Sequence, residues 1–569
     1  MAVRDELGRA KSRSTKFRVQ NTSSMGSRST SKHWWLWMQV VVVLVVLASE
    51  FGVHGQDLGT WEILLANAGI ASMHAAVTNY GTVVLLDRTN IGASQIALPN
   101  GTCRDSNDLV LPHDCTAHSV LFDPSTNTVR PLTILSDTWC SSGQFMPDGT
   151  LMQTGGDFEG IRKVRTFVPC PATGNCDWVE STTQQLQQPR WYATNQLLPD
   201  GRQIIIGGRA VFNIEYIPPS ANGPLYFDFL NATNDGQNDN LYPFVHLLPD
   251  GNLYIFANRD SIVYNYVTNT VVKTFPRIPG EPRNYPSAGS SVMLPLLASN
   301  QFSVVEVLIC GGAQYGAFLE PWTRKPCSIT CERIVVTDPN PIWVEEQMPI
   351  RRCMGDMILL PNTDVLIING ASIGSQGWGF ADDPVLNPVR YMPYGSPDAR
   401  FTTLTPSTIP RMYHSTANLL PDGRVMCAGS NSHQFYTFTG DYPTELRIDA
   451  FSPPYLSASV APIKPTISVY PLQVTYGTPF TVTVSTPSAL TTVIELNLMS
   501  APFNTHSYAQ GQRLVNLNVG GSVQVAAASV YQITATAPPT PQIAPPGYYM
   551  MFAVNQRVPS VAVWIRVTS

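Results

Sequence analysis

A tyrosine beside a histidine, Tyr413–His414, stands seven to eight residues before a Pro-Asp-Gly turn. Phenolate oxygen and imidazole nitrogen both bind metals, so the pair could form half of a metal site. In a regular strand, adjacent side chains point to opposite faces of the sheet. The two residues could therefore share one metal only where the backbone is irregular, at the mouth of a sheet. Alone, the pair is a weak signal, because a core tyrosine beside a structural histidine is the commoner case.

Two further stretches place a chemically capable residue at the same distance from such a turn. Cys140 and Tyr192 each stand seven residues before their own Pro-Asp-Gly. Equal offsets predict that Cys140, Tyr192 and the Tyr413–His414 pair lie at the same height, each at the start of the inner strand of its own repeat. They would then face one end of a common channel, and this shared register is more informative than any one of the residues.

The turn belongs to a pattern that recurs from about residue 57: an apolar run, a turn, a second apolar run and a stop at small residues. Asp-Gly between apolar runs is a strong hairpin signal, because glycine accepts the positive φ of a tight turn. Successive copies lie about 45 to 70 residues apart, the length of a four-stranded kelch-type propeller blade with variable loops. Four clear and three degenerate copies predict seven blades: Phe145–Gly156, Leu197–Gly208, Leu247–Phe256 and Leu419–Gly429, then His74–Arg88, Met293–Gly312 and Leu359–Gly370.

The predicted fold class is all-β: a seven-bladed kelch-type β-propeller over residues 57–451, then an immunoglobulin-like β-sandwich over residues 452–569. Only 13% of the 569 residues are charged, while glycine and proline number 40 and 47, which favours short strands and turns. The second domain is predicted from six or seven short strand-like runs rich in threonine, valine and proline. His506 lies in a polar stretch between two of these runs.

Residues 1–55 differ from the rest of the chain. Residues 1–33 are polar and basic, and an almost wholly apolar run extends from Trp34 to Ala48. We interpret this segment as a signal peptide with an extended basic region, cut after Gly55; an uncleaved anchor is the alternative. The sequons at Asn100 and Asn231 agree with export and glycosylation.

Ten cysteines fit an oxidising compartment better than the cytosol. Close spacing suggests three disulfides, although sequence cannot settle the connectivity: Cys103 with Cys115, Cys170 with Cys176, and Cys327 with Cys331. Cys140, Cys310, Cys353 and Cys427 are then left over. Cys310 and Cys427 end apolar runs and are interpreted as small buried hydrophobes.

With these residues in place, the sequence resembles the copper radical oxidases, the family of glyoxal oxidase and galactose oxidase. The resemblance covers residue 57 to the C-terminus and rests on the recurring blades and four dipeptides: Trp139-Cys140, Trp191-Tyr192, Tyr413-His414 and Thr505-His506. The Ala-Pro-Phe-Asn-Thr-His-Ser stretch that contains His506 looks more like the glyoxal oxidase branch of plants and fungi.

The resemblance implies one copper ion and a role for each site residue. His414 and His506 would be imidazole ligands, Tyr192 an equatorial phenolate, and Tyr413 an axial ligand that also acts as general base. Cys140 would be joined through sulfur to the ring of Tyr192, a self-processed thioether that carries a tyrosyl radical. The radical and Cu(II) together would supply the two oxidising equivalents that an aldehyde or alcohol oxidase needs. His506 would have to reach the channel on a loop sent down the bore by the C-terminal domain.

The implied activity is the oxidation of small aldehydes such as glyoxal and methylglyoxal to carboxylic acids, with O2 reduced to H2O2. A primary-alcohol or galactose oxidase acting on cell-wall carbohydrate is the alternative enzyme. A kelch-type binding scaffold without a metal is the alternative of another class. We expect a secreted, extracellular monomer of the cell wall or apoplast, without stable membrane contact after cleavage, whose H2O2 a peroxidase could consume. A formal net charge of −5 gives no basic surface for nucleic acid.

One departure from the galactose oxidase branch concerns the cover of the radical. In that branch a tryptophan eighteen residues after the ligand tyrosine stacks on the thioether, and here that position is Ala210. This predicts a less shielded radical and favours small aldehydes over hexoses. The stretch Arg283-Asn-Tyr285-Pro286 is assigned to a substrate loop.

The remaining candidates are interpreted mostly as structural. Five histidines are assigned to the core, the surface or the surroundings of the site: His74, His113, His118, His246 and His433. Trp139 and Trp191 are assigned to blade packing, with shaping of the substrate pocket as the alternative.

Overall fold

The computed structural model describes residues 57–106, 110–524 and 529–569. The predicted signal peptide or anchor, residues 1–55, lies outside these residues. Over the described ranges, no helix is long and apolar enough to cross a membrane. Strands dominate, and the α-helix α2 (Asp228–Ala232) is short.

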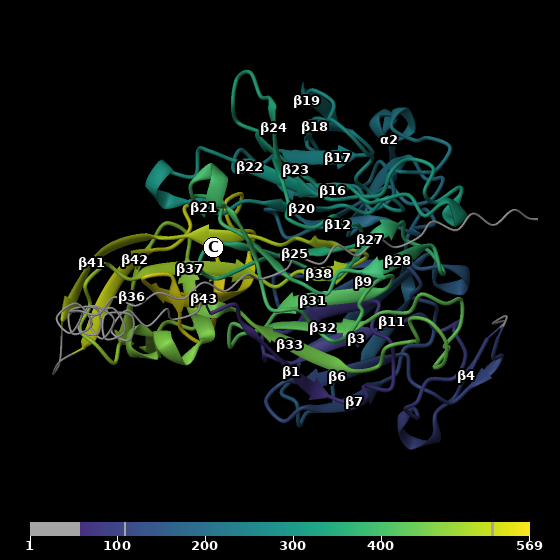
Figure 1. The fold of residues 1–569 in the computed structure, drawn as a ribbon, viewed down its shortest axis with the longest axis horizontal. Helices are drawn as coiled ribbons and strands as arrows, with labels where there is room; N and C mark the ends of the chain where they lie inside the picture. The colour runs from purple at the N-terminus through teal and green to yellow at the C-terminus, as the bar shows by residue number, and fades with distance from the viewer. Residues whose placement is uncertain (1–56, 107–109, 525–528) are drawn as a thin grey trace, which may run out of the picture. The chain divides into compact units, whose positions relative to one another are not determined.

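Seven antiparallel sheets of at least four strands follow one another between residues 60 and 452 of the described chain, beside two two-stranded sheets (Figure 1). The last sheet takes its outer strand, β1, from the start of the chain, so the two ends of this region are hydrogen-bonded together. The first sheet contains β2 (His74–Val77), β3 (Val83–Leu86), β6 (Ser119–Asp123) and β7 (Thr128–Leu132); the second β8 (Ser142–Phe145), β9 (Leu151–Thr154), β10 (Lys163–Phe167) and β11 (Trp178–Gln185). The third contains β12 (Thr194–Leu197), β13 (Gln203–Ile206), β14 (Asn213–Ile217) and β15 (Leu225–Tyr226); the fourth β16 (Phe244–Leu247), β17 (Leu253–Ala257), β18 (Asp260–Asn265) and β19 (Thr270–Thr274); the fifth β20 (Ser290–Met293), β22 (Glu306–Cys310), β23 (Thr330–Val335) and β24 (Trp343–Gln347). The sixth contains β25 (Asp356–Leu359), β26 (Val365–Ile368), β29 (Val389–Tyr391) and β30 (Phe401–Thr403); the seventh β31 (Ser415–Leu419), β32 (Val425–Gly429), β33 (Ile448–Ser452) and β1 (Thr60–Leu65).

The Pro-Asp-Gly sequences form the turns between the first two strands of their sheets, as predicted. In the β8–β9 turn, Gly149 has φ +90°, a backbone that favours glycine, and the Asp148 carboxylate accepts the Thr150 N–H at 2.9 Å. The same aspartate-to-backbone bond recurs at Asp200, Asp250 and Asp422. Each turn therefore fixes the register of its hairpin locally, which is why the offset from the turn predicts position.

A buried arginine connects the strands of five of these sheets. Its Nη1 donates to the backbone carbonyl near the small-residue stop of its own repeat: Arg165 to Gly155, Arg190 to Gly207, Arg283 to Gly311, Arg352 to Asn369 and Arg411 to Gly429. These guanidinium groups satisfy carbonyls that the strand ends leave free.

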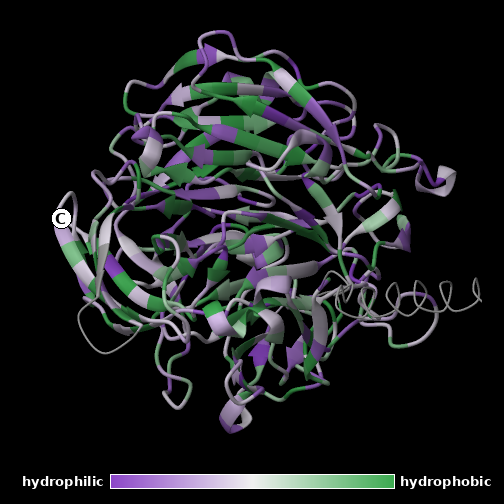
Figure 2. Cartoon of the chain, turned by 60° about the vertical axis from the view of Figure 1, so that its left-hand side comes forward, coloured by the Kyte–Doolittle hydropathy of each residue, from purple (hydrophilic) through white to green (hydrophobic). Residues whose placement is uncertain are grey.

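Apolar side chains fill the space between neighbouring sheets. Ile204 and Ile206 of the third sheet, for example, belong to one buried cluster with Val245, Leu247 and Ile255 of the fourth. Figure 2 shows the hydrophobic residues gathered along the strands.

The C-terminal residues form two facing groups of strands, as a β-sandwich requires. One sheet has the order β34 (Thr466–Val469), β36 (Pro479–Ser485), β42 (Val530–Thr536) and β41 (Asn518–Gln524). The other has the order β21 (Leu296–Leu297), β40 (Leu514–Asn516), β37 (Glu495–Ser500), β43 (Gly547–Asn555), β45 (Val563–Thr568) and β35 (Gln473–Thr475), with β44 (Val558–Pro559) beside β43.

A hairpin leaves the C-terminal strands and lies among the first strands of the seven sheets. Its strands are β38 (Phe503–Thr505) and β39 (Tyr508–Gln510), and β38 pairs with β2. Between them, β38 and β39 contact β2, β8, β12, β16, β20, β25 and β31, the first strand of every one of the seven sheets. In Figure 1, β38 lies beside β25 and β31, away from β36, β41 and β42. The predicted insertion of the loop that carries His506 is confirmed.

The disulfides correct part of the cysteine prediction. Cys103–Cys115 and Cys170–Cys176 are present as expected. Cys327 bonds Cys353, and Cys310 bonds Cys331, so the predicted Cys327–Cys331 bridge is wrong. Cys310 and Cys331 are directly opposite each other on β22 and β23, a cross-strand proximity that sequence spacing does not reveal. Cys140 and Cys427 are buried free thiols.

Candidate metal centre

The backbone just before several first strands is left-handed. The φ angles are +51° at Cys140, +65° at Tyr192, +49° at Tyr242 and +63° at His414. Such angles are uncommon for residues with a Cβ and persist only where the surroundings impose them. Backbone bonds of 2.9 Å link neighbouring sheets here, from Tyr192 N–H to the Cys140 carbonyl and from Tyr242 N–H to the Tyr192 carbonyl. The irregular backbone required at Tyr413–His414 is therefore present, within a set of similar positions.

The five predicted site residues lie together and are buried. Cys140 and Tyr192 belong to one buried cluster, and the neighbouring thiol adds to the raised pKa of Tyr192. Cys140 Sγ lies 3.2 Å from His506 Nε2, and potential ligand atoms of Cys140, His414 and His506 all fall within 4.8 Å of one another. The Tyr413 ring stacks on His414 with 3.8 Å between centroids.

A chain of hydrogen bonds fixes the tautomer of His506. His74 Nε2 lies 3.0 Å from the Thr138 carbonyl, which can only accept, so His74 Nε2 carries the proton. Burial lowers the pKa of His74 to about 4, so its Nδ1 is unprotonated and accepts the Thr505 hydroxyl at 2.7 Å. Thr505 Oγ1 then accepts from His506 Nδ1 at 2.6 Å. His506 Nε2 keeps its lone pair, which is the form that binds a metal.

Three tyrosine hydroxyls meet at the same place. Tyr192 Oη donates to Tyr285 Oη at 3.1 Å, and Tyr285 Oη lies 3.1 Å from Tyr413 Oη. The Tyr285 ring stacks on Tyr192 with centroids 4.4 Å apart. Ala210 is exposed, and the ring of Tyr285 stacks on Tyr192, whose shielding the sequence predicts to be weaker than in the galactose oxidase branch.

Burial sets the protonation of the site. It lowers the pKa of His414 and His506 well below the usual value, so both imidazoles are neutral ligands at pH 7. It raises the pKa of the Tyr192 and Tyr413 hydroxyls well above the usual value, and the neighbouring thiol and tyrosines add to this rise. Burial also raises the pKa of the Cys140 thiol. The phenols therefore stay protonated unless a cation is bound beside them.

The residues fit a copper ion. Both ring nitrogens of His414 are buried and have no hydrogen-bond partner among the described residues. A buried imidazole with neither nitrogen satisfied is costly, and it indicates a ligand that completes the site. Two imidazoles with two phenol oxygens form a donor set that suits Cu(II).

The other candidates have structural roles. His246 and His433 hydrogen-bond to Ser291 and to the Tyr442 carbonyl. His118 is buried and bonds Asp114 at 2.6 Å. His74, assigned to the surface or core, is buried and orients His506 through Thr505.

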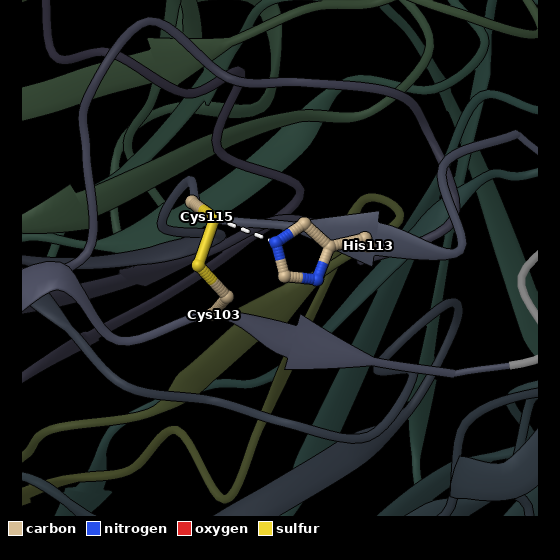
Figure 3. Close-up of side chains that lie close together, drawn as sticks. All are labelled: Cys103, His113 and Cys115. Atoms are coloured by element: carbon tan, nitrogen blue, oxygen red, sulfur yellow. Dashed lines mark hydrogen bonds between the residues drawn. A yellow bond between two sulfur atoms is a disulfide. The ribbon is translucent and has the colours of Figure 1, made fainter.

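A second group of potential metal ligands, Cys103, His113 and Cys115, is shown in Figure 3. Its two sulfurs form a disulfide and therefore offer no thiolate. His113 is exposed and bonds Asp105 at 2.7 Å. This group is a surface cluster.

Tyr285 is the central residue that sequence reasoning placed only loosely, in a substrate loop. One signal could have found it: Arg190-Trp-Tyr192, Arg283-Asn-Tyr285 and Arg411-Met-Tyr413 share one arginine-to-tyrosine spacing. The structure explains the spacing, because in each case the arginine is the buried connector of its sheet and the tyrosine follows at the entrance to the first strand.

Two family models match the chain: glyoxal oxidase N-terminus over residues 73–455, and galactose oxidase-like, early set domain over residues 464–567. The chain is 57% identical over 509 residues to aldehyde oxidase GLOX of Vitis pseudoreticulata, covering 89% of this chain and 97% of that protein. It is 41% identical over 528 residues to aldehyde oxidase GLOX1 of Arabidopsis thaliana, covering 90% and 84%.

Among solved structures, the chain is similar to a fungal alcohol oxidase of the AA5 family in complex with copper, with a TM-score of 0.69 and 18% identity. The match covers 90% of this chain and 100% of that chain. At this identity the likeness concerns the fold alone, and it agrees with the all-β architecture.

Proposed function

The chain belongs to the glyoxal oxidase family, and we propose that it is a copper radical oxidase of small aldehydes of the glyoxal and methylglyoxal type. It oxidises them to carboxylic acids and reduces O2 to H2O2. The observation that carries the proposal is the buried set of Cys140, Tyr192, Tyr413, His414 and His506, in which neither ring nitrogen of His414 has a hydrogen-bond partner among the described residues.

The finer architecture belongs to the same proposal. The seven sheets close into a seven-bladed propeller over residues 57–451, and residues 452–569 form an immunoglobulin-like domain. Two features support this: β1 completes the last sheet, and the β38–β39 hairpin contacts all seven first strands. A propeller leaves only short, protected sheet edges.

His414, His506, Tyr192 and Tyr413 are the residues that would hold the copper. A bound Cu(II) would supply one of the two oxidising equivalents and the positive charge that favours phenolate over phenol. The other equivalent is a radical on Tyr192, joined by a thioether to Cys140. The location of both side chains in one buried cluster supports this link.

The residues of the chain divide the oxidation between them. For an aldehyde hydrate, RCH(OH)2, Tyr413 accepts the proton of one hydroxyl as general base, and the Tyr192 oxygen accepts the hydrogen atom of the carbon. Loss of two protons and two electrons leaves RCOOH, and O2 takes up both to become H2O2. Tyr285 bonds to Tyr192 and stands 3.1 Å from Tyr413, so it holds both oxygens in one place.

Localisation and partners follow from the proposed activity. We expect an extracellular monomer of the cell wall or apoplast, with glycans at Asn100 and Asn231, whose H2O2 a peroxidase consumes. Both sequon asparagines are exposed, and four disulfides suit an oxidising compartment.

Mass spectrometry of copper-loaded secreted protein tests the mechanism. The peptides holding Cys140 and Tyr192 should be found joined, with the loss of two hydrogens. Peroxide assays with glyoxal beside a primary alcohol and galactose then identify the substrate class. Separate peptides after treatment with copper and O2 would refute the radical mechanism, and preferred oxidation of galactose would refute the aldehyde assignment.

A further inference from the structure

A short two-stranded sheet carries several metal-binding residue types on one of its faces. Its strands are β4 (Arg104–Asp105) and β5 (His113–Asp114), and residues 105 and 113 lie directly opposite each other. Side chains alternate along a strand, so the residues at positions 103, 105, 113 and 115 share one face. We call these four residues the β4–β5 cluster: Cys103, Asp105, His113 and Cys115.

Contacts within the β4–β5 cluster orient the imidazole toward the sulfurs. His113 Nδ1 lies 2.7 Å from Asp105 Oδ1, and a carboxylate oxygen can only accept, so Nδ1 carries the proton of the neutral ring. The other ring nitrogen, Nε2, then has a lone pair and lies 3.5 Å from Cys115 Sγ (Figure 3). A histidine that binds a metal has this arrangement, with a carboxylate on one ring nitrogen and a lone pair on the other.

In the disulfide form, this contact between Nε2 and Sγ joins two atoms that carry no hydrogen. Cys103 and Cys115 are bonded to each other, so neither sulfur has a proton to donate. Potential ligand atoms of Cys103, His113 and Cys115 all lie within 4.8 Å of one another, close enough for one ion. Cleavage of the disulfide supplies two thiolates, and two thiolates with an imidazole suit a closed-shell cation such as Zn(II) or Cu(I).

The opposite face of the sheet holds the strands in place without the disulfide. Arg104 and Asp114 are buried there and lie 3.8 Å apart as an ion pair. Arg104 Nη2 donates to the Thr89 carbonyl at 3.0 Å, and the Leu98 N–H donates to the Cys115 carbonyl at 2.9 Å. The ligand atoms should therefore stay together after the sulfur–sulfur bond is broken.

Exposure distinguishes this disulfide from the others of the described chain. Cys115 is exposed, whereas both cysteines of Cys310–Cys331 and of Cys327–Cys353 are buried. Cys170–Cys176 is partly exposed, but it belongs to no group of three potential metal ligands among the described residues. A thiol can thus reach Cys103–Cys115, and Cys170–Cys176 provides a matched comparison.

We propose that the β4–β5 cluster is a second metal site, which binds a cation of the Zn(II) or Cu(I) type when its disulfide is reduced. Cys103, Cys115 and His113 hold the ion, and Asp105 orients His113. A low-molecular-weight thiol or dithiol supplies the two electrons and two protons that convert the disulfide to two thiols, and it is itself oxidised to a disulfide. Binding of the cation then releases both thiol protons.

H2O2 reverses the change. Two thiols and one H2O2 give the disulfide and two waters, and the ion is released because its sulfur ligands are lost. H2O2 is the product of the proposed oxidase, and only this last link rests on the proposed function.

Zinc binding to the full-length, copper-free protein tests the site. Zn(II) is the probe because it does not oxidise thiols. A water-soluble phosphine reduces the disulfide and is removed without air, and alkylation with peptide mass spectrometry reports which cysteines have reacted. The reduced protein should bind one more zinc ion per chain than the disulfide form, and H2O2 should release that ion. Zinc bound at the proposed copper site is counted in both forms.

Three variants assign the extra ion. His113→Gln keeps both cysteines and removes the imidazole, and Asp105→Ala removes only its partner; both positions are exposed, so both variants should fold. Asp105→Ala should weaken zinc binding to the reduced protein by about tenfold to a hundredfold, and His113→Gln should weaken it further. The matched control, Cys170→Ser with Cys176→Ser, removes another disulfide within reach of the phosphine and should leave the extra ion in place.

Equal zinc stoichiometry in the reduced and disulfide forms would overturn the site, as would unchanged affinity in His113→Gln. Loss of the extra ion in the control variant would also overturn it, because the ion would then belong to Cys170 and Cys176. The same holds if no phosphine concentration that leaves the protein folded reduces Cys103–Cys115. Extra zinc that depends on His113, in a protein that oxidises no aldehyde, would support the site and refute only the oxidase.

Discussion

At the scale of single residues, the site depends on side chains that orient other side chains. Thr505 is the clearest case, because its hydroxyl donates to His74 and accepts from His506. Because His506 Nδ1 then carries the proton, the lone pair of its Nε2 is free to bind a metal. Partners of metal ligands matter for affinity nearly as much as the ligands.

Replacing Thr505 with valine should therefore weaken copper binding without removing a ligand. The valine keeps the shape of the side chain but can no longer accept the His506 Nδ1 proton, so the competing tautomer becomes available. We expect copper affinity to fall by about ten- to a hundredfold, measured by competition with a chelator. Thr505→Ser, which restores the hydroxyl, should recover most of it. Equal affinity in Thr505→Val and the parent would show that the tautomer is set elsewhere.

Tyr285 has two separable contributions to the radical that we propose on Tyr192. Its ring stacks on Tyr192, and its hydroxyl bonds the Tyr192 and Tyr413 oxygens. Tyr285→Phe should keep the stacking and lower kcat by about five- to tenfold, as expected for one net hydrogen bond. Tyr285→Ala should also shorten the lifetime of the radical, followed by its optical and electron paramagnetic resonance signals. A radical equally long-lived in the alanine variant would exclude a shielding role.

At the scale of the elements, the repeated hairpins determine which residues of the site can be predicted from the sequence. Cys140, Tyr192 and His414 could be aligned from sequence, because each stands seven residues before a turn that fixes its own hairpin. The partner of Cys327 could not be inferred, because Cys353 belongs to a different repeat and approaches it only in the fold.

The buried arginines that connect the strands lead to a prediction for the free energy of unfolding. Arg352 donates to the Asn369 and Asn387 carbonyls in a sheet that contributes no proposed copper ligand. Arg352→Met leaves both carbonyls without a donor and should lower the free energy of unfolding by about 2–4 kcal/mol, measured by denaturant titration. Its exposed neighbour provides the control: Arg351→Met should cost less than about 1 kcal/mol. Similar losses in both variants would show that the buried connection adds little.

For the molecule as a whole, the pH dependence of stability combines buried carboxyl groups and buried histidines, which act in opposite directions. Burial raises the pKa of Asp137, Asp239, Asp356 and Glu332 to about 7. A raised carboxyl pKa means that the native state holds its proton more tightly, so stability falls as pH rises from about 4 to 7. Burial lowers the pKa of His74 to about 4 and that of His246 to about 3, and the stability contributed by these two groups rises with pH over nearly the same range.

Replacing Glu332 should change the pH dependence of stability in one direction. Among the described residues, neither buried carboxyl oxygen of Glu332 has a hydrogen-bond partner, and Oε1 lies 3.8 Å from Arg283 Nη2 in an ion pair. Glu332→Gln therefore breaks no hydrogen bond and removes only the charge that faces Arg283. The variant should match the parent near pH 4.5 and become the more stable of the two as pH rises to 8, in thermal unfolding of the copper-free proteins. Glu320→Gln, at an exposed position, should show no such trend. A stability difference independent of pH would mean that Glu332 is ionised in the fold throughout.

The C-terminal domain contributes to the fold of the sheets as well as a ligand. Side chains from residues 508–512 accept backbone N–H groups of three separate first strands: Gln510 from Asn195, Tyr508 from Val245, and Gln512 from Leu359. At about 1–3 kcal/mol for each N–H left unsatisfied, their loss approaches the roughly 5–15 kcal/mol that stabilises a folded domain.

A chain ending at residue 463 should therefore fail to fold as well as fail to bind copper. We expect rapid proteolysis and loss of the near-ultraviolet circular dichroism signal. The matched control is full-length His506→Ala, which loses the ligand but retains these three bonds, and should unfold cooperatively while binding no copper. If the shortened chain also unfolded cooperatively, the ring of sheets would be stable by itself, and the inserted hairpin would serve only to deliver His506.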